Sequence, residues 1–437
     1  MKVLMVDMDG CCLDLALRAQ ACGHDVRVFM GPDKHTGERV CYGDGLIKRV
    51  PHWEPLVKWA DLIFLADNAK YLHGLEGLRD RGYPIFGPNK ETAKWELDRA
   101  YGQRIFQQAG IDTIPSATFT RYQEARNYVV KNQGRYVSKP NGDVCKALSY
   151  VSKSPKDMCF MLDKWHKEGK MKDEFILQEF IPGIEFAVGG YFGPNGFSQY
   201  LMENFEHKKL MNGEKGVNTG EMGTVLRYTQ TSKLAEEVLL PLTGALHRAG
   251  HTGYIDVSVM VDKKGKPWPM EFTARPGWPL DQIRLALEDS DPIGWMYDLL
   301  DGKDTFKPSS NTAVGVVVTM PDFPYEHITN RGNCGYPLYG ITERNSKHIH
   351  FAQCMLGKAP GDNATLADEE MIVTAGAYVY VATGTDEQVS VAAEKAYKVI
   401  DQVELPNSPG YRTDIGDRLK KQIPELQALG YAKGWRY

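Results

Sequence analysis

The sequence predicts an α/β protein that begins with a small parallel sheet wound with helices on its faces. The first observation is an apolar strand, an amphipathic helix and a second strand in succession, over residues 2–7, 13–22 and 24–30. This order is typical of a strand–helix–strand unit, which places its two strands parallel in one sheet. The second observation is a pair of further apolar strands, at 62–66 and 84–86. Residues 1–90 are therefore predicted to form an N-terminal α/β domain.

Length and composition narrow the class of protein. A chain of 437 residues is too long for one compact core and suits several packed units. Its net charge of −4 gives no reason to expect nucleic acid, whose binders usually carry a basic patch. No apolar run approaches the roughly 20 residues that span a bilayer, and no signal peptide is apparent. The eight cysteines are scattered without a CxxC pair, which favours reduced thiols. We expect a cytoplasmic protein that binds neither nucleic acid nor membrane.

The third observation is a hairpin, predicted from two short strands at 254–261 and 268–272 that flank a tight turn. Asp256 on one strand and Glu271 on the other could meet across it, with the Thr273 hydroxyl close by. These hard oxygen ligands suit Mg²⁺ and its phosphate partners. Arg275 then supplies a forked cation for a phosphoryl group or a carboxylate. The alternative is an acidic hairpin on a solvated face of the sheet.

The segment between these two regions carries candidate nucleotide contacts. A long helix is predicted over 90–108, followed by a strand and a helix over 122–132. Lys139 ends an apolar strand before a loop that contains glycine, an arrangement that can grip phosphate; an edge-strand lysine before a turn is the alternative. The strand 174–180 leads into residues 181–185, where backbone groups can pair with an adenine edge and Glu185 can bind ribose hydroxyls.

The remaining elements complete the chain. A polar, glycine-rich loop is predicted over 212–224, an amphipathic helix over 234–249 and a further helix within 279–299. From residue 310 the pattern becomes rich in strands, at 313–319, 349–352, 371–375 and 378–383, with helices within 386–404 and 419–437. Residues 310–437 are therefore predicted to form a separate α+β unit.

The first turn, at residues 7–12, has features of two known motifs and matches neither of them fully. Residues 7–10 (DMDG) resemble the nucleophile loop of haloacid-dehalogenase-type phosphatases, but Cys11 stands where that family has Thr or Val. A dinucleotide fingerprint requires GxGxxG, and only Gly10 is present, so NAD is disfavoured.

The order of these features resembles the ATP-grasp superfamily and, within it, the phosphoribosylamine–glycine ligase family. The resemblance covers nearly the whole chain. It rests on FGPNKETAKWELDRAY, LQEFIPGIEFA, EHKKLMNGEKGVNTGEMGT, MEFTARPG and YRTDIG, of which the NTGEMG loop and the RTDIG segment are the specific motifs. It implies an ATP-grasp fold with a linking helix at 91–113, a lid at 114–180, a central catalytic subdomain at 181–305 and a C-terminal α+β cap at 310–437.

The resemblance also implies the reaction and its residues. A carboxylate takes the γ-phosphate of Mg·ATP (Mn²⁺ is a possible substitute) to give an acyl phosphate, and an amine then displaces phosphate. Arg275 and Lys139 would be catalytic. The implied ATP contacts are Arg99, Lys139, Glu179, Phe180, Ile181 and Glu185. The implied metal ligands are Asp256, Glu271 and Thr273. The implied acceptor contacts are Gly10, Lys208, Asn218, Thr219 and Gly220.

The departures from the family lie on the substrate side. The family's GNGGREHAL loop is DMDGCCLDL at 7–15, its GPEAPL loop is ADNAKY at 66–71, its GLAAGKG lid is GDVCKA at 142–147, and its RFGDPE is RPGWPL at 275–280. Three functions stay open: synthesis of glycinamide ribonucleotide, a ligase for another amino acid and amine, and a non-catalytic ATP-binding protein. A monomer or a small homo-oligomer is expected.

Overall fold

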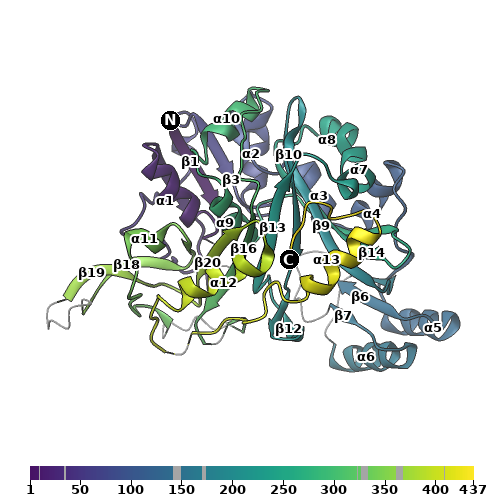
Figure 1. The fold of residues 1–437 in the computed structure, drawn as a ribbon. Coiled ribbons are helices and arrows are strands. Elements are labelled where there is room, and N and C mark those ends of the chain that lie inside the picture. The colour runs from purple at the N-terminus through teal and green to yellow at the C-terminus, as the bar shows by residue number, and fades with distance from the viewer. Residues whose placement is uncertain are drawn as a thin grey trace.

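The computed structural model describes the chain apart from residues 9, 34–35, 141–148, 170–173, 322, 326–332, 361–367 and 408. In the described part, no helix is long and apolar enough to cross a membrane. Figure 1 shows a broad central sheet with the N-terminal region on one side and a small lobe projecting on the other.

The N-terminal region is the parallel sheet that the sequence predicted, with strand order β2-β1-β3-β4. Its elements are β1 (Lys2–Asp7), α1 (Leu13–Ala21), β2 (Asp25–Met30), a 3₁₀ turn (Glu54–Leu56), β3 (Leu62–Leu65), α2 (Leu72–Arg79) and β4 (Ile85–Phe86). Both faces of β1 are buried, because Val3 and Met5 join one apolar cluster and Leu4 and Val6 join another. This explains why β1 reads as a continuous apolar run.

The single helix predicted over 90–108 is two helices, α3 (Lys90–Leu97) and α4 (Arg99–Gln108). Asp98 interrupts them with an extended backbone, and its carboxylate accepts a hydrogen bond of 2.9 Å from the Tyr101 amide. Aspartate favours this capping role over a position inside a helix. The break places Arg99 at the first position of α4.

The projecting lobe is a four-stranded sheet of order β5-β8-β6-β7 with two helices packed on it (Figure 1). Its elements are β5 (Ser116–Phe119), α5 (Tyr122–Asn132), β6 (Tyr136–Pro140), β7 (Tyr150–Val151), α6 (Pro155–Glu168) and β8 (Phe175–Glu179). Tyr122, Trp165 and Phe175 belong to its own apolar core. The lobe is joined to the central sheet through residues 180–182.

The central sheet is antiparallel and eight-stranded, of order β15-β14-β9-β10-β13-β16-β20-β17. The strands are β9 (Gly183–Gly193), β10 (Gly196–Glu206), β13 (Gly223–Thr229), β14 (Gly253–Asp262), β15 (Pro267–Thr273), β16 (Thr312–Thr319), β17 (Ile349–Phe351) and β20 (Tyr378–Asp386). The strands after residue 310, expected in a separate unit, extend this sheet because β16 pairs with β13 over residues 223–227. The first and last parts of the chain therefore share one core with its middle.

Two other predicted segments differ from expectation. The helix predicted over 234–249 is divided into α7 (Lys233–Val238), a 3₁₀ turn (Leu240–Leu242) and α8 (Thr243–Ala249). Pro241 lies in the break, since proline lacks the amide that a continuous helix needs. The polar loop predicted over 212–224 contains one strand of a hairpin, β11 (Lys209–Met211) and β12 (Lys215–Asn218).

The remaining elements surround the central sheet. They are α9 (Leu280–Arg284), a 3₁₀ turn (Leu285–Leu287), α10 (Gly294–Leu300), α11 (Glu343–Ser346), β18 (Cys354–Pro360), β19 (Asp368–Thr374), α12 (Val389–Ile400) and α13 (Leu419–Ala428). The β18–β19 hairpin extends away from the body of the molecule at the edge opposite the projecting lobe (Figure 1).

Candidate active site

The hairpin of β14 and β15 presents its polar side chains on one face of the central sheet. Asp256 lies directly opposite Thr273, and Ser258 lies opposite Glu271. Because alternate residues of a strand share a face, these four side chains form one patch. Glu185 on the neighbouring strand β9 belongs to the same patch, since the Ser258 hydroxyl donates to its carboxylate at 3.3 Å.

Glu271 is held by two cations that come from distant parts of the chain. Arg99, at the start of α4, forms an ion pair with one carboxylate oxygen, and Lys208 Nζ lies 3.7 Å from the other. Burial raises the pKa of Glu271, but Arg99, Lys208 and Lys139 outweigh it and hold that pKa well below its usual range. Glu271 is therefore a carboxylate at every physiological pH.

Lys208 is the centre of the acidic patch. Its Nζ lies 2.7 Å from Glu185 and 2.9 Å from Glu206, which are on adjacent strands. Burial lowers the pKa of Lys208, but Glu185, Glu206 and Glu271 raise it well above its usual range. The sequence placed Glu185 at a ribose and Lys208 at the acceptor, and the structure pairs the two side chains directly.

Lys139 lies on strand β6 of the projecting lobe, and its charge acts on Glu271 of the patch. Burial lowers its pKa to about 8, with Arg99 and Lys208 acting in the same direction and Glu271 and Glu185 opposing them. Arg99 Nε also donates to the Pro140 carbonyl at 3.3 Å. Arg99 and Lys139 thus place two cations beside Glu271. The glycine-containing lid loop at 142–147, which the sequence set against the family's glycine-rich lid, lies outside the described residues.

The predicted adenine contacts, Glu179, Phe180 and Ile181, end β8 and connect it to β9. The Glu179 amide donates to the Pro115 carbonyl at 2.9 Å and the Phe180 amide donates to the Arg135 carbonyl at 2.8 Å. The Arg135 guanidinium also lies 3.5 Å from the centre of the Phe180 ring. These hydrogen bonds therefore anchor the connection to the projecting lobe at the point where it leads into the central sheet.

Asp256 is a buried carboxyl with a raised pKa. The Tyr254 hydroxyl donates to it at 2.8 Å. Burial, followed by the charge of Glu206, raises its pKa to about 7, against the lowering effects of Tyr254 and Thr273. A divalent cation beside this group would stabilise its charged form.

The donors Asp256, Glu271 and Thr273 are all oxygen atoms, as Mg²⁺ prefers. Among the described residues, no group of three or more His, Cys, Asp or Glu side chains is placed to hold a metal ion by itself. Mg²⁺ is usually bound by one or two carboxylates together with substrate phosphates and water. The donor set therefore fits a metal that arrives with a nucleotide.

Arg275 follows β15 and pairs with an acidic residue that the sequence did not single out. Its Nη2 lies 3.2 Å from Glu96 of α3, whose other oxygen accepts from the Ala274 amide at 2.9 Å. Arg275 Nη1 also donates to the Pro276 carbonyl at 3.1 Å. Glu96 thereby fixes both the backbone and the guanidinium of this loop.

Gly10 lies in a loop that uses its amide groups internally. Its φ of +84° suits glycine, and a Cβ atom there would lie 2.7 Å from the Tyr42 ring. The Gly10 and Cys12 amides donate to the two oxygens of Asp7, at 3.0 and 2.7 Å. Asp67 accepts from two amides of its own loop in the same way, at 3.0 and 2.8 Å.

The other predicted acceptor contacts lie around Lys208. Asn218 ends β12 and pairs with Lys209 across the small hairpin. The amide and the hydroxyl of Thr219 both donate to the Lys208 carbonyl, at 2.8 and 3.0 Å, while Gly220 is exposed. Thr219 therefore holds the backbone of the lysine at the centre of the patch.

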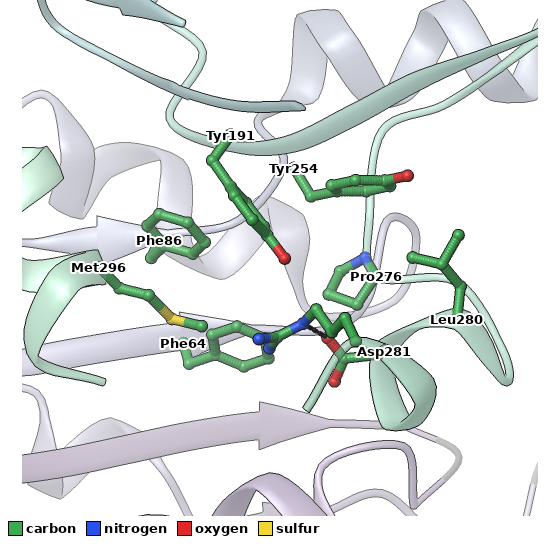
Figure 2. A pocket seen from close by; sticks show the side chains of 9 residues that line it. Phe64, Phe86, Tyr191, Tyr254, Pro276, Leu280, Asp281 and Met296 are labelled. Carbon is green, nitrogen blue, oxygen red and sulfur yellow. Dashed lines mark hydrogen bonds and ion pairs between the residues drawn. The ribbon is translucent and has the colours of Figure 1, made fainter. Parts of the chain in front are cut away.

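The loop after Arg275 is tied to the N-terminal domain around a small cavity of about 10 Å³. Figure 2 shows Tyr191 of the central sheet pointing into this cavity, with Tyr254 above Pro276 of the loop, and Phe64 of β3 and Asp281 of α9 on the opposite side. Arg284 Nε lies 2.7 Å from Asp281, and its Nη1 lies 2.8 Å from Glu288. The cavity has room for about one water molecule, so it serves packing and not substrate binding.

Sequence reasoning missed Glu96, Glu206, Ser258 and Glu221. Ser258 follows Asp256 by two positions, and Glu206 precedes Lys208 by two positions, so strand alternation was an available signal. No such signal existed for Glu96, because its partner Arg275 is distant in sequence.

Comparison with known proteins identifies a related family. The family description "Phosphoribosylglycinamide synthetase, ATP-grasp (A) domain" matches residues 97–279. The phosphoribosylamine–glycine ligase of Neisseria meningitidis serogroup B is 27% identical over 366 residues, covering 79% of this chain and 81% of that protein. That of Salmonella typhimurium is 26% identical over 381 residues, covering 82% and 83%.

Solved structures support the same fold. The crystal structure of phosphoribosylamine–glycine ligase from Thermotoga maritima matches with a TM-score of 0.72 at 21% identity, over 95% of this chain and 100% of that one. N5-carboxyaminoimidazole ribonucleotide synthetase from the same organism matches with a TM-score of 0.58 at 16% identity, over 93% and 99%. The predicted ATP-grasp fold is confirmed.

Proposed function

We propose that this chain, whose residues 97–279 match the phosphoribosylglycinamide synthetase ATP-grasp domain, is an ATP-dependent ligase that joins glycine to phosphoribosylamine. The observation that carries the proposal is the convergence of Arg99, Lys139, Lys208 and Glu271 on one patch at the junction of the lid and the central sheet. Three cations around one carboxylate leave an excess of positive charge, which suits a polyphosphate and its metal. An ordinary surface carboxylate would not gather three cations around itself.

Each group has a role in the proposed reaction. Arg99 and Lys139 bind the phosphates of ATP and neutralise charge as the γ-phosphoryl group moves. Asp256, Glu271 and Thr273 would hold Mg²⁺, which would supply positive charge to the phosphate oxygens. Residues 179–181 contact the adenine and Glu185 the ribose.

The amide bond forms in a second step. The amine attacks the carbonyl carbon of the acyl phosphate, the C–N bond forms, and the C–O bond to phosphate breaks with its electron pair leaving on phosphate. Arg275 holds the reacting carboxyl group of the substrate. To do so, its guanidinium either leaves Glu96 or contacts Glu96 and the substrate together. Positioning and charge neutralisation carry this mechanism, so it needs no serine or cysteine nucleophile.

A second candidate is a ligase of the same class that uses another amine. The observation in its favour is that the Gly10 and Cys12 amides already donate to Asp7. The amide groups of this loop already donate hydrogen bonds to Asp7. The loop therefore binds a phosphate group less well, because the Asp7 carboxylate repels the phosphate charge. Trp278 and Leu280, in place of the family's Asp and Glu, change the polarity of the same region.

The test is ADP release from Mg·ATP with glycine and freshly generated phosphoribosylamine, against mixtures that lack one component. Release that requires both substrates supports the proposal. Release that returns only with another amino acid or amine supports the second candidate. Bound ATP without release, across a panel of amino acids and amines, would contradict both and favour a non-catalytic ATP-binding protein.

A further inference from the structure

Glu221 is a buried acidic residue inside the NTGEMG loop, where the family motif has glycine. Its side chain is 8% exposed and accepts a hydrogen bond from the Thr224 hydroxyl. Thr224 lies opposite Glu206 in the pairing of β10 with β13, so Glu221 reaches the face of the sheet that carries the acidic patch. Its charge also acts on that of Glu206 and of Asp256.

Glu221 forms no close ion pair among the described residues: Lys208 pairs with Glu185, Glu206 and Glu271 and lowers the pKa of Glu221 only through its charge. A buried carboxylate without a partner is costly, and such groups are usually paired. Burial and Glu206 raise the pKa of Glu221 well above its usual range. An N–H donor bound beside Glu221 would therefore favour its charged form.

Two further buried polar side chains in this region lack partners in the described part of the chain. The Tyr378 hydroxyl is unpartnered, although its residue is 6% exposed, and its ionisation is disfavoured first by burial and then by the charge of Glu221. Asn204 is fully buried with both amide atoms unpartnered, and it precedes Glu206 by two positions on β10. Unsatisfied polar groups at this depth are uncommon in native proteins and point to a missing ligand.

Aromatic rings flank the same space. The Trp278 ring lies 4.5 Å from that of Tyr378 at 83°, and the Phe323 ring lies 5.8 Å from it. Phe323 and Met222 also line an open groove of about 430 Å³ beside the β11–β12 hairpin. Met222 is the residue after Glu221, so the backbone next to this carboxylate borders the groove.

We propose that Glu221 binds the amino group of the acceptor substrate, with Tyr378 and Asn204 as neighbouring polar contacts. The inference rests on the proposed ligase function and names the residue that selects the amine. In the ligation step, nitrogen attacks the acyl carbon, phosphate leaves with the C–O electron pair, and one N–H proton passes to the Glu221 carboxylate or to the departing phosphate. A carboxylate at this position favours acceptors with N–H donors and disfavours an anionic group here.

The experiment separates the two half-reactions. Glycine and Mg·ATP with hydroxylamine give a trapped hydroxamate that reports acyl phosphate formation without the acceptor, and phosphoribosylamine replaces hydroxylamine in a parallel assay. For Glu221→Gln we expect the KM for phosphoribosylamine to rise about 10- to 100-fold, the range for loss of a hydrogen bond to a charged group. The KM values for ATP and glycine in the hydroxylamine assay should stay within about twofold. Glu236→Gln, at an exposed glutamate of α7, is the matched control.

The possible results are distinct. An unchanged KM for phosphoribosylamine in Glu221→Gln would overturn the inference and leave the ligase function standing. Equal losses in both assays would show a structural role and would also overturn it. Absence of hydroxamate and of ADP with the unaltered protein would overturn the proposed function itself. If Glu221→Gln does not fold, Tyr378→Phe, which removes only an unpartnered hydroxyl, must raise the same KM.

Discussion

The ion pair between Arg99 and Glu271 joins two residues that are 172 positions apart in the sequence. Arg99 begins α4, and Glu271 lies on β15 of the central sheet. The pair therefore connects the linking helix to the hairpin that carries the predicted metal ligands. Both side chains are partly exposed, at 25% and 31%, so solvent and ligands can reach them.

Replacing Glu271 with alanine should abolish ATP turnover while the fold survives. Arg99 and Lys208 would lose a shared carboxylate, but their partial exposure lets water solvate them. Loss of a group that organises transition-state charge costs about 10²- to 10³-fold in rate. ADP release measures the loss of ATP turnover, and the thermal unfolding midpoint shows whether the fold survives. Normal ADP release from the variant would remove Glu271 from the metal site.

Lys139 should make nucleotide binding depend on pH. Because its pKa is about 8, a substantial fraction is neutral at pH 8–9, and bound phosphate should draw a proton onto it. ATP affinity should therefore fall as pH rises through about 8, and binding at pH 8.5 should take up protons. Calorimetry in buffers of different ionisation enthalpy measures that uptake. The Lys139→Arg variant, whose side chain stays charged, should bind ATP without proton uptake. Equal proton uptake by that variant would contradict the assignment of the pH dependence to Lys139.

The lowered pKa of Lys139 also makes the free energy of unfolding depend on pH. Between about pH 8 and the ordinary value of 10.5, the folded chain holds fewer protons at Lys139 than the unfolded chain does. The contribution of Lys139 to the free energy of unfolding should therefore increase as pH rises through this window. Lys139→Met should lack that contribution, which denaturant unfolding across the window can measure.

Much of the fold follows from local patterns in the sequence. The apolar run of residues 2–7 and the alternation of residues 254–261 predict strands at the places where β1 and β14 lie. Pairing between distant strands has no such local signature. The contact of β16 with β13 is non-local, so the sequence suggested a separate C-terminal unit where the structure has a continuous sheet. Asp98 and Pro241 interrupt helices that periodicity alone predicted to be continuous.

The candidate site was predictable only in part, for a similar reason. Asp256 and Glu271 were found because both lie on one hairpin, where local alternation predicts the face of each side chain. Glu96 was missed because its partner Arg275 is distant in sequence, and Glu221 was missed because the acidic groups that act on it, Glu206 and Asp256, lie on other strands. The pairing of Lys208 with Glu185 could not be inferred, since it depends on β9 lying beside β10.

Asp256→Asn should stabilise the chain without metal or nucleotide at neutral and alkaline pH. The pKa of Asp256 is raised from 3.8 to about 7, so the folded state binds the extra proton between these values. Its unfavourable charge is absent below about pH 4 and fully present above about pH 7, where it costs up to about 4 kcal/mol. Denaturant unfolding at pH 5 and pH 8 should show a gain at both values and a clearly larger gain at pH 8, because only part of this cost is present at pH 5. If Asp256 binds Mg²⁺, stabilisation of the unaltered chain by Mg·ATP should be weakened in the variant.

Arg284 should be the most sensitive charged residue outside the site. It pairs with Asp281 at 2.7 Å and Glu288 at 2.8 Å, and the three side chains are at most 5% exposed. Burial lowers its pKa, but these two carboxylates and the nearby Tyr191 and Tyr228 raise it well above its usual range. Arg284→Met leaves both carboxylates buried without a cation.

Breaking a buried pair in this way typically costs about 3–5 kcal/mol, and we expect a loss of that size in the free energy of unfolding. Lys303→Met is the matched control, because its pair with Asp301 is 67% and 63% exposed and solvent-exposed pairs contribute little to stability. Urea unfolding followed by circular dichroism measures both variants. Equal effects at Arg284 and Lys303 would contradict the structural role assigned to the buried network. A larger loss at Arg284 that also impairs ADP release would show that the network holds the Arg275–Leu280 loop in its active position.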